Sequence, residues 1–292
     1  MKYYPIPEAL MNYVESIWSF ESPEQMEADE QAAIIPSGRW IVIWNYSGEY
    51  EHVIQNQSFH HSTFDLHLVG QHHTKIVLKG NVPVHSIGIS FKPYGYYSIA
   101  GSDLSNYLSK VVSISKRKLD GSEVLTDFSG NLQESVTQLT ELLTERIRFE
   151  PDSRVVHLAE QINAHKGNIL IKDLFAGINT SQRHLNKLFK LQTGITPKEY
   201  ASIVRFQEIF NRYIRNKKPE NKNELYDLFY DESHFLQSFR KVLTLQPNVF
   251  LKKTINWETS LLKNKQVCFF LLPTTSVLLL CRKKEQYVKQ SN

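Results

Sequence analysis

Apolar and polar positions alternate along the first half of the chain in a way that predicts β-strands. Residues 37–46, SGRWIVIWNY, follow a proline- and glycine-containing turn, and because both faces of this run are apolar we expect a buried strand. Residues 85–95, HSIGISFKPYG, instead alternate large apolar with small residues before the turn KPYG, and residues 74–80, TKIVLKG, are similar. We therefore expect a sheet or small barrel with one face against a core.

A helical period replaces this alternation near the middle of the chain. Residues 131–147 predict an amphipathic helix whose apolar positions share one face: Leu132, Val136, Leu139, Leu142, Leu143 and Ile147. Pro151 follows, and we place a domain boundary there, because the pattern is helical from 152 onward.

An internal repeat is the most informative feature of the second half. A shift of fifty residues aligns identical or similar residues: His184 with His234, Phe189 with Phe239, Lys190 with Arg240, Pro197 with Pro247 and Tyr200 with Phe250. One supersecondary unit therefore occurs twice. Two copies are too few for a solenoid, so the repeat favours a paired module.

The first copy has the order of a helix-turn-helix. Residues 171–177, IKDLFAG, predict a short helix and a tight connection at Gly177. Thr180 or Ser181 then caps the next helix by accepting from its unpaired N–H groups, and Gly194 lies near its C-terminal cap. Pro197 suits the first turn of a third helix.

The second helix of this unit has one apolar and one polar face. Leu185, Leu188 and Phe189 should hold it on a core, while Arg183, Asn186 and Lys187 should project from the free side. Arginine and lysine suit guanine, and asparagine suits adenine, in the DNA major groove. The remaining polar residues of this helix suit phosphate contacts: Ser181, Gln182 and Lys190. An ordinary amphipathic helix with a solvated face is the alternative.

The second half resembles the DNA-binding domain of AraC/XylS-type transcriptional regulators. The match rests on SQRHLNKLFKLQTGITPKEYASIVRFQ, residues 181–207, and on FYDESHFLQSFRKV, residues 229–242, followed by Pro247. The resemblance implies two helix-turn-helix units joined by a linker helix at 197–214, with recognition helices in successive major-groove segments. By position it places Arg183, Asn186 and Lys187 of the first recognition helix (181–191), and Ser233 and Gln237 of the second, on bases, and Arg240 on the DNA backbone.

The first half resembles a sensor domain found in one branch of the same family. The matching stretches are YYPIPEALMNYVESIWSF, IIPSGRWIVIWN, IVLKGNVPVHSIGISFKPYGYYSIAG and DLSNYLSKVVSI. This resemblance implies an effector-binding or dimerising domain of cupin-like type. It is compatible with a small-molecule effector and with a homodimer, and it identifies no particular effector.

The second unit departs from the family pattern. Glu224 and Leu228 occupy places where the family has a small residue and a glycine, and Thr244 stands where the first unit has Gly194. In the first unit Phe175 replaces a preferred alanine. We therefore treat the first unit as the main DNA-contacting element. A protein-interaction module with a degenerate helix-turn-helix domain remains an alternative.

Charge is distributed unevenly along the 292 residues, whose net charge is +4. Residues 1–150 carry 11 basic and 18 acidic side chains, residues 151–256 carry 17 and 10, and residues 257–292 carry 6 and 2. Only the second half therefore suits a polyanion such as double-stranded promoter DNA.

The C-terminal residues 257–292 lie outside the resemblance and form an atypical extension. Residues 267–281, VCFFLLPTTSVLLLC, are interrupted by Pro273 and three hydroxyl residues, whereas a membrane span needs about 20 apolar residues. A disordered or loosely packed extension is expected here, with a membrane segment as the alternative. The N-terminus has no signal-peptide pattern, so we expect a cytoplasmic bacterial protein that does not enter the membrane.

Six histidines of the first half offer an enzyme alternative: His60, His61, His67, His72, His73 and His85. Cupin-like barrels can place several imidazoles on one metal ion, and a metal enzyme of this kind would lose its metal when His72 or His73 is replaced. Their spacing matches no ligand motif, and the interpretation we prefer is histidines in polar loops or on the surface. There is no glycine-rich phosphate loop, no nucleophile elbow, and no cysteine among the first 267 residues. We expect no enzymatic activity, no cofactor and no metal.

These observations predict an α+β protein in three parts. Residues 1–150 form a mixed, β-rich effector-sensing or dimerisation domain, residues 151–256 an all-α DNA-binding domain with two helix-turn-helix units, and residues 257–292 the extension. The predicted function is sequence-specific transcription regulation, mainly through the first recognition helix.

Overall fold

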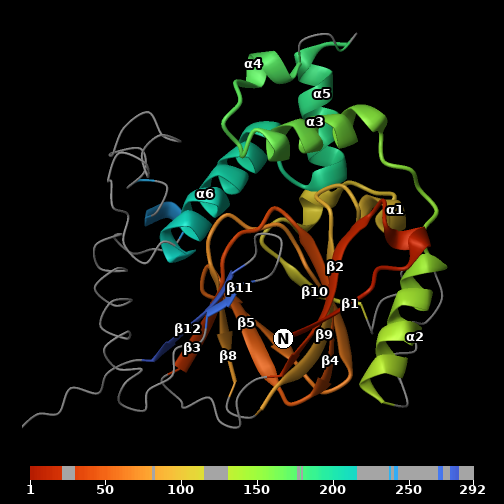
Figure 1. The fold of residues 1–292 in the computed structure, drawn as a ribbon, viewed down its shortest axis with the longest axis vertical. Helices are drawn as coiled ribbons and strands as arrows, with labels where there is room; N and C mark the ends of the chain where they lie inside the picture. The colour runs from red at the N-terminus through yellow and green to blue at the C-terminus, as the bar shows by residue number, and fades with distance from the viewer. Residues whose placement is uncertain are drawn as a thin grey trace, which may run out of the picture.

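The computed structural model describes residues 1–21, 30–80, 83–114, 131–175, 178, 180–215, 237, 240–242, 269–271 and 277–282. Helices α3 to α6 lie together at one end of a β-sandwich, and α2 lies along its side (Figure 1). A β-rich N-terminal region followed by a helical region confirms the predicted fold class.

Two six-stranded sheets form the sandwich, and every strand pair in them is antiparallel. The first sheet contains, in spatial order, β1 (Lys2–Tyr4), β2 (Val14–Glu21), β9 (His85–Phe91), β4 (Trp40–Ser47), β7 (Asp65–Val69) and β10 (Val111–Ser113). The second contains β11 (Phe269–Leu271), β12 (Val277–Arg282), β3 (Glu30–Ile34), β8 (Ile76–Lys79), β5 (Tyr50–Ile54) and β6 (Gln57–His61).

Both faces of the first sheet are buried. Alternate residues of β4 separate into two cores: Trp40 and Val42 join one, and Ile41 and Ile43 join the other. The second of these cores includes Ile54 of β5 and so lies between the sheets. The buried strand expected at 37–46 is confirmed.

Strand β9 corrects the expectation of one covered face. Its residues from Ser86 to Phe91 are all buried. The small side chains are inside because β9 is central in its sheet, and the indole N–H of Trp18 donates to Ser90 Oγ at 3.0 Å across the pair with β2. Gly88 makes room for the same indole, since a Cβ there would lie 2.0 Å from Trp18 Cζ2.

Short helices and α2 cover the outer face of the first sheet. They are η1 (Glu8–Leu10), α1 (Tyr97–Ala100), η2 (Leu104–Tyr107) and α2 (Leu132–Thr144). Asn131 and Glu134 form a capping box at the start of α2, and Val136, Leu139 and Leu143 enter the core. The amphipathic helix expected at 131–147 is confirmed with shorter ends.

The helical part contains α3 (Ser153–Ala164), α4 (Ile171–Leu174), α5 (Gln182–Thr193) and α6 (Pro197–Arg215). Their shared core includes Val155, Leu158, Leu185, Phe189 and Ile195, together with Tyr94 and Leu108 from the chain that precedes α2. A helix is present where 197–214 was expected to be helical, and its role as a linker stays a prediction. Gly177 and nearly all of the second repeat lie outside the described residues.

The C-terminal extension corrects an expectation of disorder. Its two described segments, β11 and β12, pair with each other, and β12 also pairs with β3. An exposed strand edge offers unpaired N–H and C=O groups, so an apolar run with β propensity can extend the sheet there. No helix in the described part of the chain is long and apolar enough to cross a membrane.

Candidate functional site

Helix α5 is the predicted recognition helix, and its ends form as expected. Ser181 Oγ accepts from the backbone N–H of His184 at 3.2 Å, which identifies Ser181 rather than Thr180 as the N-cap. Gly194 ends the helix in the left-handed region at φ 87°. The first turn has no acidic side chain, so its positive end is not neutralised from within the helix.

One face of α5 is fixed in the core. Leu185 and Phe189 are fully buried, Leu188 is partly buried against the same cluster, and the Phe189 ring packs on Tyr200 of α6. Gln192 Oε1 also accepts from the backbone N–H of Asp152 at 2.9 Å, just before α3 begins. The predicted apolar face is confirmed, and it fixes which side of α5 is free.

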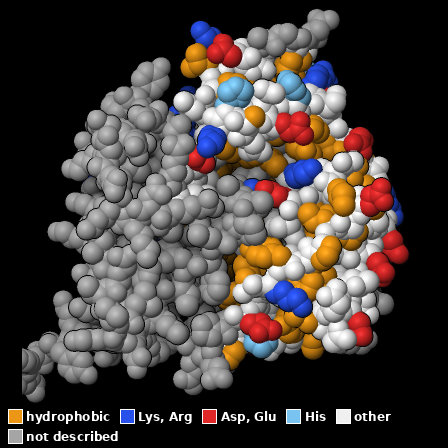
Figure 2. All heavy atoms as spheres, in the orientation of Figure 1, with side chains coloured by type: hydrophobic (Ala, Val, Ile, Leu, Met, Phe, Trp, Pro, Cys, Tyr) orange, Lys and Arg blue, Asp and Glu red, His pale blue; other side chains and the backbone are white. Residues whose placement is uncertain are grey.

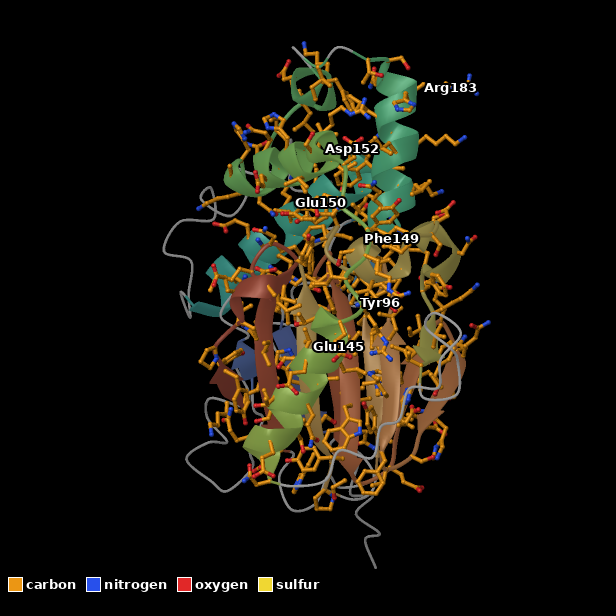
Figure 3. The ribbon with its side chains drawn as sticks, turned by 90° about the vertical axis from the view of Figure 1, so that its right-hand side faces the viewer. Tyr96, Glu145, Phe149, Glu150, Asp152 and Arg183 are labelled. Atoms are coloured by element: carbon orange, nitrogen blue, oxygen red, sulfur yellow. The ribbon has the colours of Figure 1, made fainter. Side chains whose placement is uncertain are left out.

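The polar face of α5 is largely exposed. Gln182, Arg183, Lys187 and Lys190 are exposed, whereas Asn186 is half-buried. Arg183 lies near the N-terminal end of α5 and points away from the molecule (Figure 3). The face shown in Figure 2 has basic and acidic side chains interspersed, so that face is not uniformly basic.

Of the second predicted DNA-contacting set, only part can be placed. Gln237 and Arg240 are exposed, and Ser233 lies outside the described residues. Their relation to the bases or backbone of DNA therefore stays a prediction.

The C-terminal end of α5 is attached to the β-sandwich. The Trp40 indole N–H donates to the carbonyl of Thr193 at 3.0 Å. A Cβ on Gly194 would lie 2.7 Å from Trp40 Cζ2, so this glycine fits where a larger residue would not. The two contacts hold the C-terminal end of α5, whereas Ser181 and the first turn of the helix are exposed.

Helix α6 makes a second attachment beside the first. The Gln207 side-chain amide donates to the carbonyl of Pro36, and both are buried. Gly38 has φ +72° and packs on the Tyr200 ring. His73 Nε2 lies 3.6 Å from Glu199 Oε1 near the start of α6.

The segment from Pro36 to Trp40 thus contacts both α5 and α6. Sequence reasoning missed this interface, because its partners are more than 120 positions apart.

The histidines of the first half separate into two groups. His60 is exposed and lies 3.8 Å from Glu49, and His85 is half-buried beside the Tyr46 ring. His61, His67 and His72 are buried, which corrects the interpretation of the six as loop or surface residues. They are buried because each lies on the inward side of a strand or of the chain that follows it.

Three imidazoles meet between the sheets. One ring nitrogen from each of His52 on β5, His61 on β6 and His67 on β7 lies within 4.8 Å of the other two. His52 Nδ1 lies 3.0 Å from His61 Nε2, and the His61 and His67 rings stack with centroids 3.7 Å apart. We name these three residues the histidine cluster.

Sequence reasoning did not include His52. In residues 50–54, YEHVI, period-two alternation places His52 on the same face as Tyr50 and Ile54, which would have indicated an inward position.

Asp65 lies behind two of these rings. Its Oδ2 is 2.8 Å from His61 Nδ1 and 3.4 Å from His67 Nδ1, and Ser113 Oγ donates to its Oδ1 at 2.7 Å. Burial alone would raise the pKa of Asp65, but hydrogen bonds from His61 and Ser113, together with the nearby His67 ring, hold it well below its usual range. Burial lowers the pKa of His67 to about 4 despite that carboxylate, and holds the pKa of His52 well below its usual value.

One family model matches part of the chain. It is described as a domain of unknown function (DUF6597) and matches residues 2–113, the range from β1 to β10. No curated protein matches the chain.

Among solved structures, ToxT from Vibrio cholerae is 13% identical, with a TM-score of 0.44 over 82% of this chain and 98% of that chain. ToxT bound to (E)-4-(8-methylnaphthalen-1-yl)but-3-enoic acid is 12% identical, with a TM-score of 0.45 over 82% and 99%. The AraC-like transcriptional activator CuxR is 15% identical, with a TM-score of 0.25 over 68% and 73%.

Proposed function

We propose that this protein is a sequence-specific DNA-binding transcription regulator that contacts promoter DNA mainly through α5. The observation that carries the proposal is the combination at one helix of a buried apolar face, a capped and exposed N-terminal turn, and exposed Arg183 and Lys187. The N-terminal residues of a recognition helix are those that meet base edges in the major groove.

The geometry of α5 suits a negatively charged partner. Its positive dipole end is free of acidic residues in the first turn, and residues 151–256 carry seven more basic than acidic side chains. Phosphate contacts through Ser181, Gln182 and Lys190 would dock the protein on DNA, and Arg183, Asn186 and Lys187 would discriminate between bases. Because Asn186 is half-buried, the duplex must approach α5 closely for this side chain to contact a base.

The contact between sandwich and helices supports a regulatory role for the first domain. Strand β4 faces both cores of the sandwich, and the segment that leads into it touches α5 and α6. A small-molecule effector or a second protomer that displaced β4 would therefore move the recognition helix.

A salt-dependent binding titration of the full chain on the DNA upstream of its own gene, beside scrambled DNA of equal length, tests the proposal. We expect tighter binding to the upstream DNA and a steep loss of affinity with added salt, because docking releases counterions from phosphates. Equal, weak binding to both DNAs would argue against specific recognition. Absence of binding to either DNA at low salt would favour a protein-interaction module.

A further inference from the structure

The histidine cluster is built from both sheets of the sandwich. His52 and His61 belong to the second sheet and His67 to the first, so their rings meet across the inter-sheet space. All three side chains are buried. Three polar rings in such a place, without compensating contacts, would weaken an otherwise apolar core.

Hydrogen-bond contacts connect two of the three rings to each other and to Asp65. His61 Nδ1 lies 2.8 Å from Asp65 Oδ2, and His61 Nε2 lies 3.0 Å from His52 Nδ1. His52 Nε2 and His67 Nδ1 are buried and have no hydrogen-bond partner among the described residues. Unsatisfied buried nitrogens in one cluster require an explanation, and a missing ion is one.

We propose that the histidine cluster binds one divalent transition-metal ion through one nitrogen from each of His52, His61 and His67. Neutral imidazoles are ligands for zinc, copper, nickel and iron, whereas magnesium and calcium prefer oxygen. Tetrahedral zinc at 2.0–2.1 Å from each nitrogen separates its ligand atoms by about 3.4 Å. The three nitrogens already lie within 4.8 Å of one another, and the proton shared between His52 Nδ1 and His61 Nε2 would leave when both nitrogens bind the ion.

The surroundings match what metal-binding imidazoles require. A ligating histidine usually donates its other N–H to a carboxylate, and Asp65 faces Nδ1 of both His61 and His67. Ser113 fixes the carboxylate by donating to its second oxygen. The Tyr50 hydroxyl lies 3.0 Å from His67 Nε2, where an oxygen donor or a bound water could complete the coordination.

Metal titration of the full chain tests this inference. The protein is purified in the presence of a chelator, which is then removed. Zn²⁺ is added in competition with a chromophoric chelator, and Co²⁺ is used for its visible absorption. We expect one ion per chain with a Kd of about 1 μM or tighter. The single-site variants His52→Gln, His61→Gln and His67→Gln should each lose this ion.

His60→Gln is the matched control. His60 is adjacent to His61 on β6 but 56% exposed on the opposite face, so the variant should keep the ion with unchanged affinity. Asp65→Asn leaves all three rings in place and should weaken binding about 10–100-fold. This variant covers the case in which a buried histidine variant fails to fold.

Two results would overturn the proposal: no tight ion on the folded wild-type chain, or an ion retained with unchanged affinity by folded His61→Gln and by Asp65→Asn. Circular dichroism of each variant establishes folding. The experiment does not involve DNA, so a result that overturned the metal site would leave the proposed transcription function untouched.

Discussion

The indole N–H of Trp40 donates a 3.0 Å hydrogen bond to the backbone carbonyl of Thr193, across 153 positions of sequence. Trp40 begins β4, and Thr193 is the last residue of α5. Both residues are fully buried. This bond and the close packing of Gly194 on the same indole hold the C-terminal end of α5 on the sandwich, while Ser181 and the first turn of α5 are exposed.

Replacement of Gly194 by alanine should destabilise the protein through this contact. The residue has φ +87°, which disfavours a Cβ by about 1 kcal/mol, and the added carbon would lie 2.7 Å from Trp40 Cζ2. We expect the free energy of unfolding to fall by about 1–3 kcal/mol in a urea titration.

A double-mutant cycle separates the two causes. In a Trp40→Phe background the indole carbon is absent, so Gly194→Ala should cost less, leaving mainly the backbone term. The same cost in both backgrounds would contradict the proposed packing of Gly194 on Trp40.

Ser181 should stabilise α5 as its N-cap. Ser181→Ala removes the acceptor for the His184 N–H, and the expected loss is about 0.5–2 kcal/mol in the free energy of unfolding. Ser181→Asn supplies another capping oxygen and should retain most of the stability. If the alanine and asparagine variants unfold at the same urea concentration, capping by Ser181 is not what stabilises the helix.

Glu199 should make stability depend on acidic pH. Burial alone would raise its pKa, but the backbone N–H of Thr196, at 2.8 Å, and the Thr196 hydroxyl donate to it and lower the pKa. A lowered folded-state pKa means that the carboxylate stabilises the fold above pH 4.5, and that this contribution is lost as the pH falls below 4.5.

Glu199→Gln isolates this effect, because glutamine can still accept from Thr196 but does not titrate. The difference in unfolding free energy between wild type and variant should shrink as the pH falls from 6 to 3, roughly following protonation of the carboxylate. A difference that is constant over this range would show that ionisation of Glu199 does not contribute.

Lys190 should contribute to DNA affinity without specificity. It is exposed on α5, and the loss of one phosphate contact should weaken binding to all sequences alike and reduce the slope of log affinity against log salt by about 1. Lys110→Ala, an exposed lysine that precedes β10 in the sandwich, is the control and should leave the slope unchanged. Equal salt slopes for Lys190→Ala and Lys110→Ala would show that Lys190 makes no phosphate contact.

Sequence patterns predicted the elements whose signals are local. The buried strand at β4 followed from an uninterrupted apolar run, and α2 followed from its helical period. The ends of α5 followed from Ser181 and Gly194, whose chemistry acts within one turn. Its buried face followed from the spacing of Leu185 and Phe189.

Long-range relationships could not be predicted in the same way. The Trp40–Thr193 bond depends on how two regions far apart in the sequence meet, and no local pattern records that. The histidine cluster depends on the order of strands in two sheets: β5 and β6 are neighbours, whereas β7 lies in the other sheet. Adjacent His60 and His61 point to opposite faces, so spacing alone did not separate the exposed ring from the buried one.

The most direct test of the account is the binding of wild type and Arg183→Ala to a library of DNA sites at fixed salt. Arg183 is exposed near the free end of α5, so its loss should cost about 1–3 kcal/mol on the preferred site and relax the preference at one base position. Lys190→Ala, measured in parallel, should lower affinity for every site equally. If Arg183→Ala and wild type bind the whole library with the same preferences and affinities, α5 is not the element that recognises DNA.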